Sequence, residues 1–192
     1  ILEKNKFLLQ NIIVKKVSKL DEYLFDLNGY LVIENALNKK ELKNLNNILD
    51  KLKNIKNDEW AGHVHGHNYG GKEGLNLQQI YEAGKPFEKL IDHPSWINHM
   101  LHFVGGKDTF DQHHGPLFID ENFANIRGPG EAIGIHSGHH EALQRNHYRF
   151  QEGKFHCGQV NILLALKDIG PLALIGYCLL YTSDAADEGH CV

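Results

Sequence analysis

One stretch of the sequence places a potential metal-binding histidine behind a run of small residues. If residues 131–136 form a strand, Ile133 and Ile135 lie on one face, and Ala132, Gly134 and His136 lie on the other. Small side chains next to an imidazole leave room for a bulky ligand. Because imidazole is the commonest metal ligand in proteins, His136 is a candidate metal ligand.

A carboxylate partner for His136 is less directly indicated. Two ligands separated by one residue at a strand end can hold the same ion, and a His-x-Asp or His-x-Glu pair supplies part of the non-haem iron ligand set. Gly138 stands two residues after His136 and cannot bind a metal, whereas Glu141 stands two residues after His139. The spacing of His139 and Glu141 fits a metal site in this stretch, and it equally fits a polar loop with incidental histidines.

Two amide side chains stand at the start of an apolar run. Residues 159–166 are predicted to form a core strand with Gln159 and Asn161 on the same face. A buried amide must be hydrogen-bonded, so each needs a partner. The partner is either the backbone or water, or else a polar cofactor.

Histidine is unusually frequent, with 14 among 192 residues. His63, His65 and His67 alternate along the chain and would share one face of an extended segment. The glycines around them predict a long loop over residues 57–76, which favours a surface or lid loop over a metal site. We expect His93, His99 and His102 to be surface or hydrogen-bonded side chains.

The composition excludes several classes of protein. The formal net charge is −4, which leaves no basic footprint for nucleic acid, and no stretch approaches the length of a membrane span. Three cysteines are too few for a disulfide framework and favour a reducing, cytoplasmic location. We expect Cys157 to be a small core residue.

The periodicity predicts helices first and strands afterwards. This order favours an α+β domain whose antiparallel sheet is partly covered by the N-terminal helices. The expected helices begin at Ser18, at Asn38 and at Pro94, and the expected strands are residues 29–33, 116–126, 131–136 and 159–169.

Both ends of the chain differ from the central part. Residues 1–19 are predicted to form an amphipathic lead-in helix. Residues 178–188 read as an in-frame translation of a transposase sequencing adaptor, so we interpret residues 178–192 as an artefact outside the fold. Residues 172–177 are left without an assignment.

Three segments together resemble the phytanoyl-CoA dioxygenase family of Fe(II)/2-oxoglutarate-dependent oxygenases. They are residues 25–33 with the helix that follows, residues 125–130 leading to His136, and residues 156–171, which are the most specific. The resemblance covers residues 20–171. It implies a double-stranded β-helix, a jelly-roll or cupin-like barrel with helices packed outside.

The resemblance also implies a chemistry. Such an enzyme uses Fe(II), 2-oxoglutarate and O₂ to hydroxylate a small organic substrate, with release of succinate and CO₂. His136 is then the first iron ligand and Glu141 the candidate carboxylate, while Asn161 and Gln159 contact 2-oxoglutarate or an iron-bound water.

The sequence departs from the family pattern in two places. Gly138 stands where the family has its aspartate ligand, and the distal histidine and the 2-oxoglutarate-binding arginine expected beyond Pro171 do not follow. The domain is therefore expected to be truncated at its C-terminus. The alternatives are a halogenase-like or non-catalytic relative that lacks the carboxylate, and a cupin-type metal-binding protein.

Overall fold

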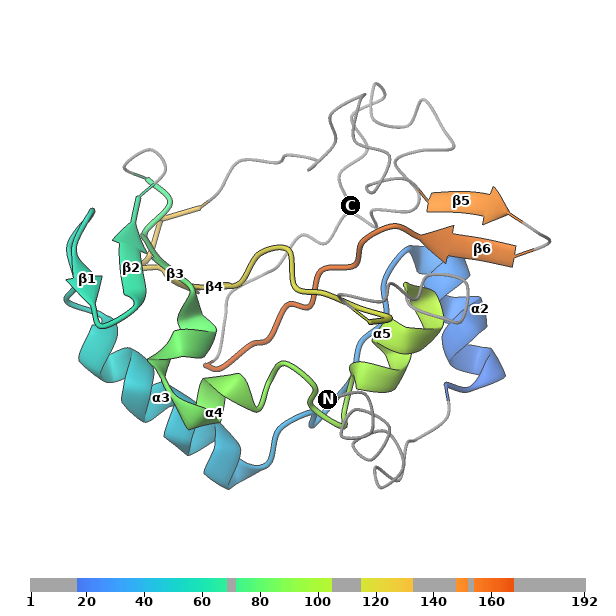
Figure 1. Cartoon of the computed structure of the whole chain (residues 1–192), viewed down its shortest axis with the longest axis horizontal. Coiled ribbons are helices and arrows are strands. Elements are labelled where there is room, and N and C mark those ends of the chain that lie inside the picture. Colours follow the sequence, from blue (N-terminus) through green and yellow to red (C-terminus); the bar gives the residue numbers. More distant parts are fainter. Residues whose placement is uncertain (1–16, 69–71, 105–114, 133–147, 152–153, 168–192) are drawn as a thin grey trace.

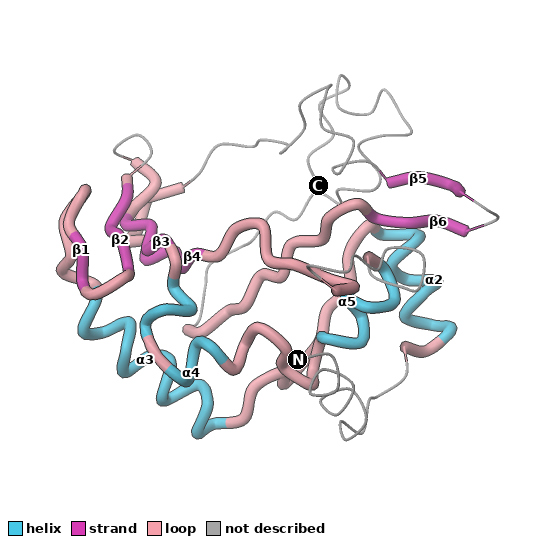
Figure 2. The backbone as a smooth tube through the Cα atoms, viewed as in Figure 1, coloured by secondary structure: helices cyan, strands magenta, loops and turns pink. Residues whose placement is uncertain are grey.

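The computed structural model describes residues 17–68, 72–104, 115–132, 148–151 and 154–167 (Figure 1). It combines helices with antiparallel sheet (Figure 2). Among the described residues, two helices are followed by three strands, then by three helical segments and then by three more strands, rather than by the single block of strands that the sequence predicts. The elements are α2 (Lys19–Asn28), α3 (Lys39–Leu52), β1 (Trp60–Ala61), β2 (Val64–His67), β3 (Leu75–Gln78), the 3₁₀ helix η1 (Ile80–Ala83), α4 (Lys85–Glu88), α5 (Ile97–Phe103), β4 (Phe123–Ile126), β5 (Tyr148–Gln151) and β6 (Lys154–Cys157).

Helix α2 begins where the sequence predicts. The Ser18 hydroxyl accepts a hydrogen bond from the Asp21 backbone N–H, and the Asp21 carboxylate accepts one from the Ser18 N–H. This reciprocal capping box satisfies two of the N–H groups that a helix start leaves unpaired. Gly29 ends the helix at φ 73°, a left-handed conformation that favours glycine.

Helix α3 is also confirmed, with a second capping box. The Asn38 side chain accepts hydrogen bonds from the Lys40 and Glu41 N–H groups, and the Glu41 carboxylate accepts one from the Asn38 N–H. Its apolar residues recur every three or four positions, so they form one stripe. Leu45 at the centre of this stripe is only 1% exposed.

The prediction of a loop over residues 57–76 is wrong, because this segment contains β1, β2 and the start of β3. Gly62, at φ 64°, and His63 form a two-residue hairpin turn between β1 and β2. Strand β3 pairs with β2 and then with β4, all antiparallel, in the order β1-β2-β3-β4. Within the described residues this sheet is open, with β1 and β4 as its edges.

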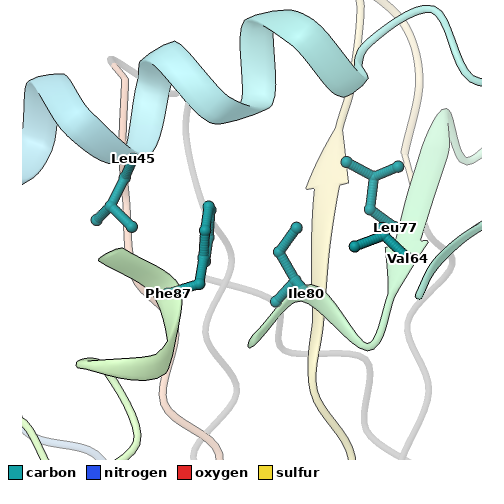
Figure 3. Packing of buried hydrophobic residues seen from close by; sticks show 5 residues of the cluster. All are labelled: Leu45, Val64, Leu77, Ile80 and Phe87. Carbon is teal, nitrogen blue, oxygen red and sulfur yellow. The ribbon is translucent and has the colours of Figure 1, made fainter. Parts of the chain in front are cut away.

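One face of this sheet packs against α3 and forms the main core. Leu45 from α3, Phe87 from α4, Ile80 from η1 and the strand residues Val64 and Leu77 meet there (Figure 3). All five are at most 5% exposed. Burying such side chains is the dominant favourable contribution to the stability of this region.

A second, smaller core joins α2 and α5. The rings of Phe25 and Phe103 stack with centroids 4.0 Å apart, and Cys157 at the end of β6 is buried beside Phe25. The core position predicted for Cys157 is confirmed. Helix α5 begins at Ile97, three residues after the predicted start at Pro94.

Residues 157–167 run between the two cores as a connecting segment (Figure 1). Val160 packs on the second core, and Leu166 packs on the main core, where its carbonyl accepts a hydrogen bond from Asn46 Nδ2 at 2.8 Å. The strand predicted over residues 159–169 is therefore wrong for its described part, residues 159–167, which have no ladder partner among the described strands.

Two other predicted strands also differ from the structure. Residues 29–33 are irregular and connect α2 to a turn before α3, and only Phe123–Ile126 of the predicted strand 116–126 joins the sheet. The strand 131–136 lies mostly outside the described residues, as do the lead-in helix before residue 17 and residues 168–192. Among the helices that the structure describes, none has the length and apolar character needed to cross a bilayer.

The main core predicts the effect of truncating its central side chain. Leu45→Ala removes a side chain that is 1% exposed and leaves a cavity between α3 and the sheet. We expect it to lower the free energy of unfolding by about 2–5 kcal/mol, measured by urea denaturation. Lys43→Ala, on the exposed face of the same helix, is the matched control and should change it by less than about 0.5 kcal/mol.

Candidate functional site

The face of the sheet that is turned away from α3 carries polar and aromatic side chains. Residues opposite each other in an antiparallel ladder project to the same side, and residues two apart along a strand do so too. The ladders therefore place one set of side chains together, which we call the polar face. It consists of Trp60, His65, His67, Asn76, Gln78, Phe123 and Asn125.

A row of amide groups crosses the polar face from β3 to β4. Gln78 Nε2 donates to Asn76 Oδ1 at 2.7 Å, and Asn76 Nδ2 donates to Asn125 Oδ1 at 2.9 Å. Asn76 is only 5% exposed, so its two partners supply hydrogen bonds that water does not. The row fixes the orientation of all three amides and presents the Asn125 amide at the exposed edge strand.

Two imidazoles lie beside this row on β2. The ring centroids of His65 and His67 are 6.0 Å apart, and the Trp60 ring stacks on His65 at 4.5 Å. Asp58 Oδ1 lies 3.8 Å from His65 Nε2. An aromatic ring and a carboxylate thus flank one side of the histidine pair.

Gly66 explains why these histidines are held so firmly. Its N–H donates to the Glu59 carbonyl at 2.9 Å, and its carbonyl accepts from the Asp58 N–H at 2.8 Å. A Cβ at this position would lie 2.5 Å from the Lys56 carbonyl oxygen, so only glycine permits this close approach. Residues 56, 58 and 59 therefore hold the backbone between His65 and His67 in place.

Strand β4 leads directly toward the metal ligands predicted from the sequence. After Ile126, Arg127 Nε donates to the Glu73 carbonyl at 3.0 Å, and the Ala132 N–H donates to the Lys72 carbonyl at 3.0 Å. These bonds fix the turn to the segment that precedes β3. His136 and Glu141 themselves lie outside the described residues.

The predicted cofactor contacts are described by the structure but are not on a core strand. Gln159 is half-buried, and Asn161 is exposed together with its neighbours Ile162 and Leu163, at 45% and 65%. The inward orientation expected for Asn161 is therefore not observed. The reason is that residues 159–167 do not pair with any described strand. In such an unpaired segment, successive side chains do not alternate between an inward and an outward face.

No three histidine, cysteine, aspartate or glutamate side chains are grouped for metal binding in the part of the chain that the structure describes. The donor chemistry of His136 and Glu141, an imidazole and a carboxylate, nevertheless matches what Fe(II) accepts in non-haem sites. The predicted iron site is thus chemically suitable.

The other described histidines have structural positions. His93 and His99 are 7% and 8% exposed, so they are buried rather than on the surface. The Ser95 N–H donates to His93 Nδ1 at 3.2 Å, and the Trp96 ring stacks on His93 at 4.5 Å. His102 Nε2 lies 3.0 Å from Glu22 Oε1, which links α5 to the first turn of α2.

The carboxyl group of Glu41, close to His93, has a lowered pKa. The hydrogen bond from the Asn38 backbone N–H lowers the pKa of Glu41 most strongly, and His93, whose Nε2 lies 3.5 Å from Glu41 Oε1, lowers it further; partial burial opposes both effects. These groups stabilise the charged form, which also lies favourably at a helix N-terminus. The folded state therefore binds the proton of Glu41 more weakly than the unfolded chain does.

Comparison with known proteins does not place the chain. Neither protein families, nor curated proteins, nor solved structures match it.

Most of the polar face was missed by reasoning from the sequence. The alternation of His65 and His67 predicts that they share a face, whereas no motif points to Asn76, Gln78 or Asn125. A signal was present: the sequence Leu-Asn-Leu-Gln at residues 75–78 alternates apolar and polar residues, as a half-buried strand does.

The amide row predicts a cost for removing its central member. Asn76→Ala leaves Gln78 Nε2 and Asn125 Oδ1 without the bonds that Asn76 provides. We expect the free energy of unfolding to fall by about 1–3 kcal/mol in chemical denaturation. Asn44→Ala, at an exposed position of α3, serves as the control; an equal loss in both variants would show that the row is not stabilising.

The lowered pKa of Glu41 predicts part of the acid sensitivity. Its ionised form contributes stability above pH about 4.5, and this contribution is lost as the pH falls through the lower pKa of the folded state. Glu41→Gln keeps a capping side chain but does not titrate. The unfolding free energy of this variant, measured between pH 6 and pH 3, should therefore decline less steeply; identical slopes would contradict this.

Proposed function

We propose that the chain belongs to a non-haem Fe(II)/2-oxoglutarate-dependent oxygenase that hydroxylates a small organic substrate. The proposal rests on the resemblance of residues 20–171 to the phytanoyl-CoA dioxygenase family and on the position of the polar face. In this proposal the sheet β1-β2-β3-β4 is one wall of a double-stranded β-helix, and α3 is one of the helices packed outside it.

The polar face is the observation that carries the proposal. In a barrel that is covered by helices outside, the sheet face away from the helices lines the interior. Here α3 covers the apolar face, so in the proposed barrel the face with two imidazoles and three amides would be the one turned inward. An interior lined with hydrogen-bonding groups suits a ligand site better than a purely structural core.

Chain continuity supports the same location for the proposed iron ligands. Asn125 lies on the polar face in β4, and His136 follows eleven residues later, beyond a turn whose start is anchored to residues 72 and 73. His136 and Glu141 would hold the iron, and the half-buried Gln159 is proposed to contact 2-oxoglutarate. With O₂ as the oxidant, bound Fe(II) and 2-oxoglutarate would supply the oxidising chemistry, while the protein supplies position and a water-poor cavity.

Gly138 favours a second candidate function. If no carboxylate replaces the family's aspartate, the same barrel can belong to a halogenase-like or non-catalytic relative, or to a cupin-type protein that binds metal without 2-oxoglutarate. These candidates share the fold and differ in which ligands bind. Ligand binding therefore separates them.

The decisive variant is His136→Ala in the full-length gene product. Loss of a direct iron ligand should abolish Fe(II)-dependent release of succinate from 2-oxoglutarate, measured by chromatography of the reaction mixture. His63→Ala, at an exposed position in the β1–β2 turn, is the matched control and should retain turnover. Unchanged turnover in His136→Ala would remove this histidine from the site.

Binding of Fe(II) and 2-oxoglutarate to the unaltered protein distinguishes the alternatives. Under anaerobic conditions with Fe(II), binding of 2-oxoglutarate should produce a weak visible charge-transfer band. Bound iron without this band would indicate the cupin-type alternative, and the absence of both would indicate a non-catalytic protein.

A further inference from the structure

We propose that His65 and His67 form a two-imidazole chelate for a late first-row divalent metal ion, separate from the iron site proposed at His136. The observation behind it is the pair of imidazoles on the polar face of β2, two residues apart. Neither the resemblance nor the proposed oxygenase function assigns metal binding to these residues.

The separation of the two rings suits a single ion. A metal-bound imidazole nitrogen lies about 2.0–2.1 Å from the ion, so two ring centroids on one ion are about 4.5–6.5 Å apart. The centroids of His65 and His67 are 6.0 Å apart with their planes at 37°. The observed centroid separation therefore lies within the range for two imidazoles on one ion.

The backbone under the chelate is already organised. Strand β2 is paired on both sides, by β1 and by β3, so the spacing between residues 65 and 67 is set by the sheet. Gly66 is clamped to residues 58 and 59 by two backbone hydrogen bonds. Ligands on a rigid strand lose less entropy when they bind an ion than ligands on a loop do.

Charge and access favour a cation at this position. The carboxylate of Asp58 lies 3.8 Å from His65 Nε2, and Asn57 Nδ2 donates to its other oxygen at 2.8 Å. Asn57 is in turn fixed by a hydrogen bond from the Asn68 N–H to its Oδ1 at 2.8 Å. The His65 side chain is 22% exposed, so a hydrated ion can reach it from solvent.

The donor set indicates the class of metal. Two neutral imidazoles with water in the other positions suit Cu(II), Ni(II) or Zn(II) much better than Mg(II) or Ca(II), which prefer oxygen ligands. Affinity for such sites rises to Cu(II) along the first-row series, so Cu(II) is the most sensitive probe.

Trp60 reports on this site, because its ring stacks on His65 with centroids 4.5 Å apart. Titration of the full chain with copper(II) chloride should quench part of the tryptophan fluorescence in a saturable way. The copper concentration at half-maximal quenching is the midpoint of this titration. In the double variant His65→Asn/His67→Asn, the midpoint should rise by at least about tenfold. Trp60→Phe should remove the saturable phase, since the other tryptophan, Trp96, is buried against His93.

Two matched variants distinguish this chelate from other copper binding. His63→Asn lies in the adjoining turn and should leave the midpoint within about twofold of the original value. His136→Ala should also leave it unchanged, so failure of the proposed iron site does not affect the result. If the double variant does not fold, as judged by circular dichroism, the single His67→Asn variant decides. The proposal is overturned if the variants at positions 65 and 67 retain the original midpoint. It is also overturned if His63→Asn or His136→Ala raises the midpoint as much as the variants at positions 65 and 67 do.

Discussion

The packing of α3 against one face of the four-stranded sheet is the constraint on which the rest of the structure depends. Leu45, Val64 and Leu77 are almost completely buried in this layer. Because side chains alternate along each strand, burying these residues assigns their neighbours to the opposite face. The layer therefore positions the histidines and amides, although it contains none of them.

Close approach at Gly66 reinforces this arrangement. At Gly66 the segment before β1 packs closely against β2, and no larger side chain fits between them. The same backbone contacts hold Asp58 beside His65. A single position thus serves both the packing of the sheet and the geometry of the proposed chelate.

Local signals predicted the helices well and the sheet poorly. The capping boxes at Ser18 and Asn38 need only residues three apart, so they can be read directly from the sequence. Strands β1, β2 and β3 have two to four residues each and stand among glycines that are typical of loops. The pairing of β3 with β4, about 50 residues later, is a tertiary effect that no local pattern contains. Residues 159–167 show the converse, because a strongly apolar sequence forms a connecting segment between two cores.

The central claim is that the polar face and the proposed iron ligand share one cavity. Paramagnetic Mn(II) substituted for iron, with the side-chain amide signals followed by NMR, tests this most directly. The account predicts strong broadening of the Asn125 and Asn76 amide signals. It also predicts a sharp signal from Asn46, whose amide lies on α3 and bonds to the Leu166 carbonyl. Broadening of the Asn46 signal without broadening of the Asn125 signal would contradict this claim. So would an effect on Asn125 that disappears when His65 is replaced but persists when His136 is replaced.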